Sequence, residues 1–133
     1  MKKGLTLIEI LIVMVLIGLT VSIVIPNIGR SYDKIKFRTE TKKVYELIQK
    51  AKFHAFYYQK TVAVSAADRQ LIIQGLALPE EDIPKLAVEV RKEVLFSPNG
   101  VSTGGEVMLY LKETPKAVIR VEAFSGRVTL EWL

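Results

Sequence analysis

The chain has no cysteine and a single histidine, His54, in 133 residues. Without cysteine there is no disulfide framework, no thiolate metal site and no cysteine nucleophile. One histidine without cysteine or a carboxylate at ligand spacing indicates a packing or surface role, and it makes no Ser-His-Asp triad. We therefore expect no enzyme, no bound metal and no cofactor.

Acidic residues are scarce in the middle of the chain. Residues 30–60 hold nine Lys and Arg against three acidic residues, whereas residues 61–133 hold eight against ten. A basic segment followed by a mildly acidic one suits contacts between subunits, attraction to phosphates or a solvated helix face. The densest acidic stretch, Glu80-Glu81-Asp82, follows no EF-hand pattern and is interpreted as a solvated loop.

One long apolar run is present, over the 21 residues from Leu5 to Ile25. It exceeds the apolar region of about 7–15 residues in a secretory signal peptide, and no small-residue cleavage site follows it. A helix of about 20 apolar residues can span a bilayer. The run therefore predicts a single membrane-spanning helix, of which a plain signal anchor is the simplest form.

Two residues argue against a plain signal anchor. Glu9 lies inside the apolar run, where an ionised carboxylate costs on the order of 2.5–3.5 kcal/mol and marks a functional residue. Gly4 ends the basic tip just before the run and offers a cut site. A cut there would create a positive amine on Leu5, one helical turn from Glu9. We expect the amine of a neighbouring subunit, rather than that of the same chain, to pair with this carboxylate and set the register of packed helices.

The segment Lys3-Gly4-Leu5-Thr6-Leu7-Ile8-Glu9 resembles the class III signal sequence of type IV pilins and type II secretion pseudopilins. The resemblance implies that a prepilin peptidase cuts between Gly4 and Leu5 and methylates the new amine. It also implies that Glu9 pairs with the N-terminus of a neighbouring subunit, and that Lys2 and Lys3 stay in the cytoplasm although the count of flanking cations does not favour that side. Leu5 departs from the more common phenylalanine but keeps its apolar character.

The helical pattern continues beyond the apolar run to about Tyr58. Pro26, where many members of the family carry proline, lacks a backbone donor, and Gly29 lowers helix propensity, so a kink or a meltable stretch is expected near 26–29. An apolar stripe recurs every three or four residues. Its members are Ile28, Tyr32, Ile35, Val44, Ile48, Ala51 and Ala55, with Leu47 beside them.

Beyond Lys60 the period changes to two, which predicts strands joined by short turns. The expected strands are Thr61–Ala66, Gln70–Gln74, Leu86–Val90, Glu93–Phe96, Glu106–Leu111, Ala117–Ala123 and Arg127–Trp132. The face shared by Val128, Leu130 and Trp132 is expected to lie on the helix stripe, and Leu78–Lys85 to form an exposed connection. The predicted fold is α+β: a long N-terminal helix with a C-terminal antiparallel sheet domain, as in pilins.

A second resemblance covers the C-terminal half. Leu95-Phe96-Ser97-Pro98-Asn99-Gly100 and Ser125-Gly126-Arg127-Val128 resemble the GspH/FimT family of minor pseudopilins and minor pilins. In some T-type pilins a Gly-Arg-x-Arg motif binds DNA. Gly126 and Arg127 match it, but Thr129 replaces the second arginine. The calcium-binding loop of major pseudopilins is not found, which favours a minor subunit.

The expected organisation is a leader over residues 1–4, a transmembrane and filament-core helix over 5–29, and a periplasmic head over 30–133. The leading hypothesis is a minor pseudopilin of type II secretion, stored in the inner membrane. Its expected partners are the prepilin peptidase, major and minor pseudopilins, membrane lipid and secreted cargo. The alternatives are a minor type IV pilin for pilus assembly or DNA uptake, with Arg127 as the DNA contact, and a signal-anchored binding domain.

Overall fold

The computed structural model describes residues 4–133, and Met1, Lys2 and Lys3 of the expected leader lie outside the described residues. The chain divides into two compact units, one ending at Lys36 and the other spanning Phe37–Leu133. Helix α1 (Leu7–Tyr57) supplies all the regular structure of the first unit and the first element of the second. The helix ends within one residue of its predicted end.

The second unit, which we call the head, contains seven strands in two antiparallel sheets. One sheet has the order β2-β1-β4 and the other the order β3-β5-β6-β7. The strands are β1 (Val62–Ala67), β2 (Gln70–Gln74), β3 (Ala87–Val90), β4 (Val94–Phe96), β5 (Gly105–Leu111), β6 (Thr114–Val121) and β7 (Val128–Trp132). A short 3-10 helix, η1 (Glu80–Asp82), lies between β2 and β3. The predicted α+β fold, a long helix followed by an antiparallel sheet domain, is confirmed.

All seven predicted strands are present, and the largest difference is at β6. That strand begins at Thr114 rather than at Ala117 and ends at Val121 rather than at Ala123. The register with β5 shifts between Leu109 and Tyr110, and Tyr110 then pairs with Pro115. Proline cannot donate a ladder hydrogen bond, so it is tolerated next to such an irregularity.

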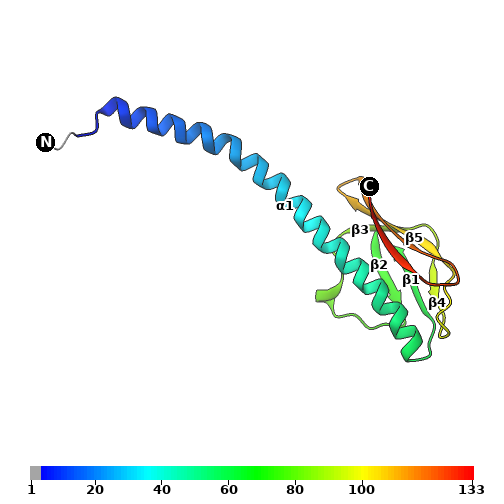
Figure 1. The fold of residues 1–133 in the computed structure, drawn as a ribbon. Coiled ribbons are helices and arrows are strands. Elements are labelled where there is room, and N and C mark those ends of the chain that lie inside the picture. Colours follow the sequence, from blue (N-terminus) through cyan, green and yellow to red (C-terminus); the bar gives the residue numbers. More distant parts are fainter. Residues whose placement is uncertain (1–3) are drawn as a thin grey trace. The chain divides into compact units, whose positions relative to one another are not determined.

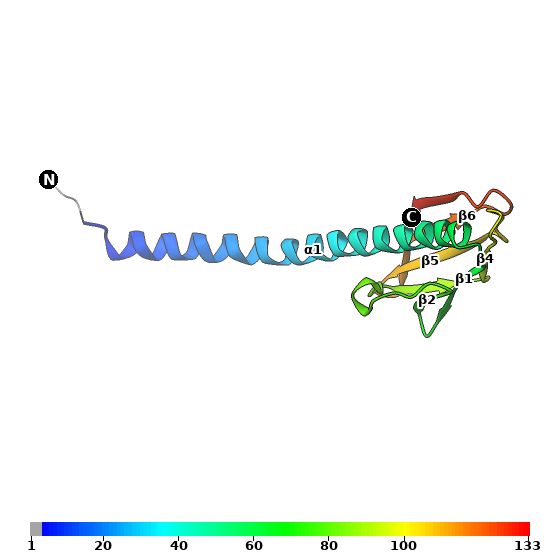
Figure 2. The same ribbon diagram turned by 90° about the horizontal axis from the view of Figure 1, so that it is seen from below.

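The head's core forms between the second half of α1 and the sheets. Val44, Ile48, Ala51 and Ala55 of the predicted stripe are fully buried, together with strand residues such as Ile119. The part of the helix that carries them lies against the strands in both views (Figures 1 and 2). Burial of apolar side chains between one helical face and a sheet is the main source of stability in such a domain.

The first three residues of the stripe do not take part in this core. Ile28, Tyr32 and Ile35 are each more than 60% exposed in the structure, because they precede Phe37, where the head begins. The expected face of β7 does contact the helix. Val128 is buried, and the ring of Trp132 lies edge-on to that of Phe37 with the ring centroids 6.3 Å apart.

The connection from Leu78 to Lys85 is exposed over η1, as predicted, but it is anchored near its end. Pro84 is buried, and the backbone N–H of Lys85 donates to Oε2 of Glu40 at 3.1 Å. Glu40 is only 9% exposed, and its Oε1 lies 3.4 Å from Nζ of Lys43. A carboxylate on the helix therefore holds the connection against α1.

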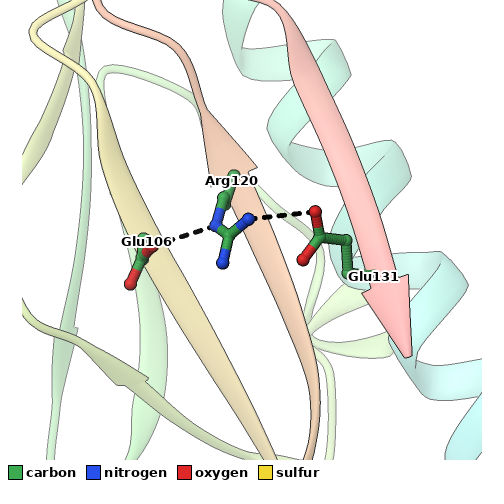
Figure 3. A network of polar contacts seen from close by, with 3 residues as sticks. All are labelled: Glu106, Arg120 and Glu131. Atoms are coloured by element: carbon green, nitrogen blue, oxygen red, sulfur yellow. Dashed lines mark hydrogen bonds and ion pairs between the residues drawn. The ribbon is translucent and has the colours of Figure 1, made fainter. Parts of the chain in front are cut away.

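Polar contacts join three neighbouring strands on the outer face of the four-stranded sheet. Arg120 on β6 donates from Nε to Glu106 on β5 and from Nη1 to Glu131 on β7, both at 3.0 Å (Figure 3). On β5, the hydroxyl of Tyr110 donates to Glu89 at 2.6 Å, and this bond raises the pKa of Tyr110 above its ordinary value of 10.0. The side chains of Arg120, Glu106 and Glu131 are all partly solvated, so each of the two ion pairs adds little stability, about 0–1 kcal/mol.

Candidate processing and assembly site

Glu9 lies in the first turn of α1, where it takes part in a reciprocal cap with Thr6. The backbone N–H and the hydroxyl of Thr6 donate to Oε2 of Glu9 at 3.0 and 3.2 Å. In return, the backbone N–H of Glu9 donates to Oγ1 of Thr6 at 3.3 Å. This arrangement is a capping box, which satisfies backbone donors that a helix N-terminus otherwise leaves free.

This cap is not among the features predicted above, although the sequence carries its signal. Thr6-Leu7-Ile8-Glu9 follows the pattern of Ser or Thr, two residues and then Glu or Gln, which marks a capping box. The structure therefore gives Glu9 a role in its own chain. Both bonds from Thr6 end on Oε2, so the other carboxylate oxygen, Oε1, lies outside the cap.

The expected cut site lies just before the cap. Gly4, Leu5 and Thr6 precede the helix, which begins at Leu7, and Leu5 is 75% exposed. A β-carbon built on Gly4 would meet no described atom within 4 Å. An exposed, non-helical peptide bond is the kind of substrate that a protease can accommodate. The carboxylate of Glu9 accepts the backbone N–H of Thr6, the residue directly after Leu5. It therefore lies one residue away from the amine that the expected cut would create on Leu5.

The helix that follows is apolar and exposed. Its most apolar window of 18 residues has a mean hydropathy of 2.9, and no part of that window is buried in the structure. By length and composition this helix can cross a membrane. A surface this apolar is stable in lipid or against other apolar helices, but not in water.

Pro26 and Gly29 lie inside α1, which continues through both residues. Proline removes one backbone hydrogen bond from the ladder, so the local structure is weaker here even though the helix is unbroken. The expected kink or meltable stretch at 26–29 stays a prediction.

An open, largely apolar hollow of about 390 Å³ lies next to this stretch of α1. Its lining residues are Val24, Asn27, Ile28, Ser31, Tyr32 and Ile35.

The other candidate residues lie in the head. Arg127 is exposed directly before β7, and His54 is half-buried on α1 with its ring 4.4 Å from that of Tyr58. Among residues 4–133, no group of three His, Cys, Asp or Glu side chains lies close enough together to hold a metal ion. Of the described candidate residues, those expected to act together, Gly4, Leu5 and Glu9, all lie at the start of α1.

Two of the comparisons with known proteins bear on this arrangement. Residues 1–25 match the family model described as the prokaryotic N-terminal methylation motif. The crystal structure of the type IV minor pilin FimU from Pseudomonas aeruginosa PAO1 has a similar fold, with a TM-score of 0.54 and 17% sequence identity. The similarity covers 71% of this chain and 91% of that one. No curated protein sequence matches the chain.

The motif covers a small N-terminal part of the chain, whereas the structural likeness covers most of it. The motif describes the N-terminal 25 residues, which include the expected cut site and Glu9. The structural likeness is too low in identity to transfer a role, but it shows that the long helix and antiparallel sheets form the pilin fold. The chain therefore combines an N-terminal segment similar to the prokaryotic methylation motif with a fold similar to that of a type IV minor pilin.

Proposed function

We propose that this chain is a filament subunit that is stored in the bacterial inner membrane and cut by a prepilin peptidase between Gly4 and Leu5. The cytoplasmic side would hold the leader, and the periplasm would hold the head. After the cut, the methylated amine of Leu5 would pair with Glu9 of a neighbouring subunit. The observation that carries this proposal is the placement of Glu9 in the first turn of an exposed apolar helix, directly after a non-helical cut site.

The geometry of the cap fits a pairing between subunits. The cap uses Oε2, so a neighbour's amine can bind Oε1 without dismantling the N-terminus of the helix. Inside lipid an unpaired carboxylate is costly, and packing alone gives apolar helices little preference for one register. A charge pair at this position would supply both the missing partner and the register.

A set of three variants separates the assembly role of Glu9 from its capping role. Glu9→Gln keeps an acceptor for the cap but loses the charge, Glu9→Leu loses both, and Thr6→Val weakens the cap alone. Removal of one partner from a buried charge pair costs about 3–5 kcal/mol. We therefore expect both Glu9 variants to insert in the membrane normally but to fall more than about tenfold in recovery with partner pilins.

Thr6→Val is the matched control, because loss of a cap costs only about 1 kcal/mol. We expect it to retain most of its recovery with partner pilins in a cross-linked pulldown from host membranes. A Glu9→Gln protein that assembles as well as the wild type would reduce Glu9 to a capping residue. An uncut N-terminus in the host would reject the processing step.

We place the subunit in a type II secretion pseudopilus, as a minor component that drives the export of proteins. The GspH/FimT-like segments of the C-terminal half are compatible with this choice, since that family includes minor pseudopilins as well as minor pilins. The second candidate is a minor type IV pilin, which the likeness to FimU favours. A DNA-uptake role receives less support, because Thr129 stands where a second arginine of the DNA-binding motif would be.

Deletion of the gene in its host distinguishes the two filament systems. For a pseudopilin we expect a broad loss of exported proteins from the culture medium, restored by the wild-type gene but not by Glu9→Leu. An unchanged secreted proteome with loss of surface pili would assign the chain to a pilus instead. Quantitative mass spectrometry of the medium and electron microscopy of the cells give the two measurements.

A further inference from the structure

The head carries a cluster of exposed aromatic side chains at the C-terminal end of α1. Phe53, Phe56, Tyr57 and Tyr58 are each between 57% and 65% exposed. The rings of Phe53 and Tyr57 are stacked with their centroids 5.7 Å apart, and that of Tyr57 meets Tyr58 edge-on at 5.0 Å. Adjacent exposed rings of this kind mark interaction sites more often than isolated ones do.

Two loops from distant parts of the sequence meet the helix at this end. The views agree that the end of α1, the segment after β4 and the turn between β6 and β7 gather at one end of the head (Figures 1 and 2). A β-carbon on Gly126 in that turn would lie 3.2 Å from the carbonyl oxygen of Gly100 and 3.3 Å from Cε of Lys52. The three segments are therefore in close contact.

A hollow lies on this surface. Its volume is about 280 Å³, and its walls are Gln49, Lys52, Phe53, Phe56 and Gly100. Most of its lining is apolar, and Lys52 supplies the cation. We call the surface formed by Lys52, Phe53, Phe56 and Gly100, with the adjoining turn at Gly126, the tip surface.

Phe124 lies in the same turn, two residues before Gly126, and is a further exposed aromatic side chain next to the tip surface. It lies in the turn between β6 and β7 with φ at 69°, a left-handed conformation that a bulky side chain rarely adopts. Its side chain is 80% exposed, so the ring gains little from packing in the head. The backbone is held there by a hydrogen bond from the N–H of Phe124 to the carbonyl of Ser102 at 2.9 Å. Glycine or asparagine would suit this conformation better, so the exposed ring costs stability and gives the head nothing in return.

The charges around the tip surface select one kind of partner. No acidic residue occurs in the sequence from Leu47 to Ala67, whereas Lys52 and Lys60 do. The turn carries Arg127 and one acid, Glu122, whose carboxylate already accepts a hydrogen bond from Ser125 at 2.9 Å. Glu122 keeps its charge in this bond, but Arg127 balances it within the turn, so Lys52 leaves the surface with a net positive charge toward an incoming carboxylate.

We infer that the tip surface docks an acidic segment of a partner protein, with an apolar side chain in the hollow and a neighbouring carboxylate on Lys52. Single-stranded nucleic acid fits less well, because it needs a track of several cations along its backbone. The tip surface offers only Lys52, with Arg127 beside it in the turn. Such docking does not depend on the filament system that the chain serves, because every residue of the tip surface lies in the head.

The test uses the full chain in detergent micelles, immobilised and exposed to a phage library of random 12-residue peptides. Phages are first depleted on the double variant Phe53→Ser/Phe56→Ser. We expect enrichment of peptides that carry Leu, Ile or Phe within two residues of Asp or Glu. No enrichment, enrichment of basic peptides, or equal retention on the double variant would overturn the inference.

Fluorescence anisotropy with one enriched peptide then measures each contribution. We expect Phe56→Ser to weaken binding more than about tenfold, and Lys52→Gln to weaken it about threefold and flatten its salt dependence. Ile72→Ser, which removes another exposed apolar side chain of the head on β2, is the matched control and should bind as the wild type does. Tighter binding of an oligothymidine probe than of the peptide would replace the protein partner by nucleic acid.

Phe124→Asn separates binding from folding. Because asparagine tolerates the left-handed conformation, we expect this variant to melt at a higher temperature than the wild type while it binds the peptide more weakly. A purely structural phenylalanine would give the opposite result, a lower melting temperature. That outcome, with peptide binding unchanged, would show that Phe124 takes no part in docking.

Discussion

Glu9 and Glu40 are carboxylates on the same helix, and each accepts a hydrogen bond from a backbone N–H. Glu9 caps the start of α1 through Thr6, three residues away, whereas Glu40 accepts from Lys85, which is 45 residues away. The first contact follows from a local pattern that can be read in the sequence. The second depends on the path of the chain through β1, β2 and η1, and the sequence contains no local signal for it.

Substitution of Glu40 should destabilise the head. In Glu40→Ala the N–H of Lys85 loses its acceptor and Lys43 loses its partner, so we expect a loss of about 1–3 kcal/mol in the free energy of unfolding. Glu40→Gln keeps an acceptor and should cost less. Urea titration of the head, followed by circular dichroism, gives both values. Glu46→Ala, an exposed acid on the same helix, is the control, and an equal loss there would contradict a specific anchor at Glu40.

At the scale of elements, the number and kind of strands could be predicted and their partners could not. The period of two and the turn residues located all seven strands, and β2 has the predicted bounds. The division into two sheets depends on the pairing of β1 with β4 and of β3 with β5. Those pairs are not joined by tight turns, so their choice depends on how side chains pack in the head rather than on local sequence.

The candidate site was predictable to a similar extent. Gly4, Leu5 and Glu9 stood out because a charge and a cut site are rare beside an apolar run. The cap formed by Thr6 has an equally clear local signal, because Thr6 and Glu9 stand at capping-box spacing. The tip surface could not be found in this way, since its parts come from three segments that only the fold brings together.

Two glycines near the tip give a prediction for the turns that join these elements. Gly104 and Gly100 both have positive φ, at 73° and 83°. A β-carbon on Gly104 would lie 2.8 Å from the backbone nitrogen of Ala123, whereas one on Gly100 would meet nothing within 4 Å. We expect Gly100→Ala to cost about 1–2 kcal/mol, the price of the conformation alone. Gly104→Ala should cost clearly more, because the backbone of Ala123 must also move.

Thermal or urea unfolding of the two alanine variants makes the comparison. Gly100→Ala serves as the control for the conformational cost, so the difference between the variants measures the close approach of the two backbone segments. Equal losses would contradict that close approach.

At the scale of the whole molecule, the two units differ in what stabilises them. The buried apolar side chains of the described residues all lie between Phe37 and Val128, within the head. The first unit exposes its apolar side chains and has no core of its own in the described chain. Its helix therefore needs lipid or neighbouring helices, whereas the head contains its own core.

This difference predicts that the head folds without the apolar helix. Residues 30–133 keep the core-forming part of α1 and every strand, and a chain of that length buries enough surface to be stable alone. We expect it to be soluble, to unfold in one cooperative transition, and to melt within about 4–8 °C of the head in the full chain, which corresponds to a difference of about 1 kcal/mol. Circular dichroism and calorimetry of both forms, the full chain in detergent, provide the measurement. A truncated chain that binds hydrophobic dyes and melts without cooperativity would show that the head depends on residues before it, and would assign part of its stability to the apolar half of α1.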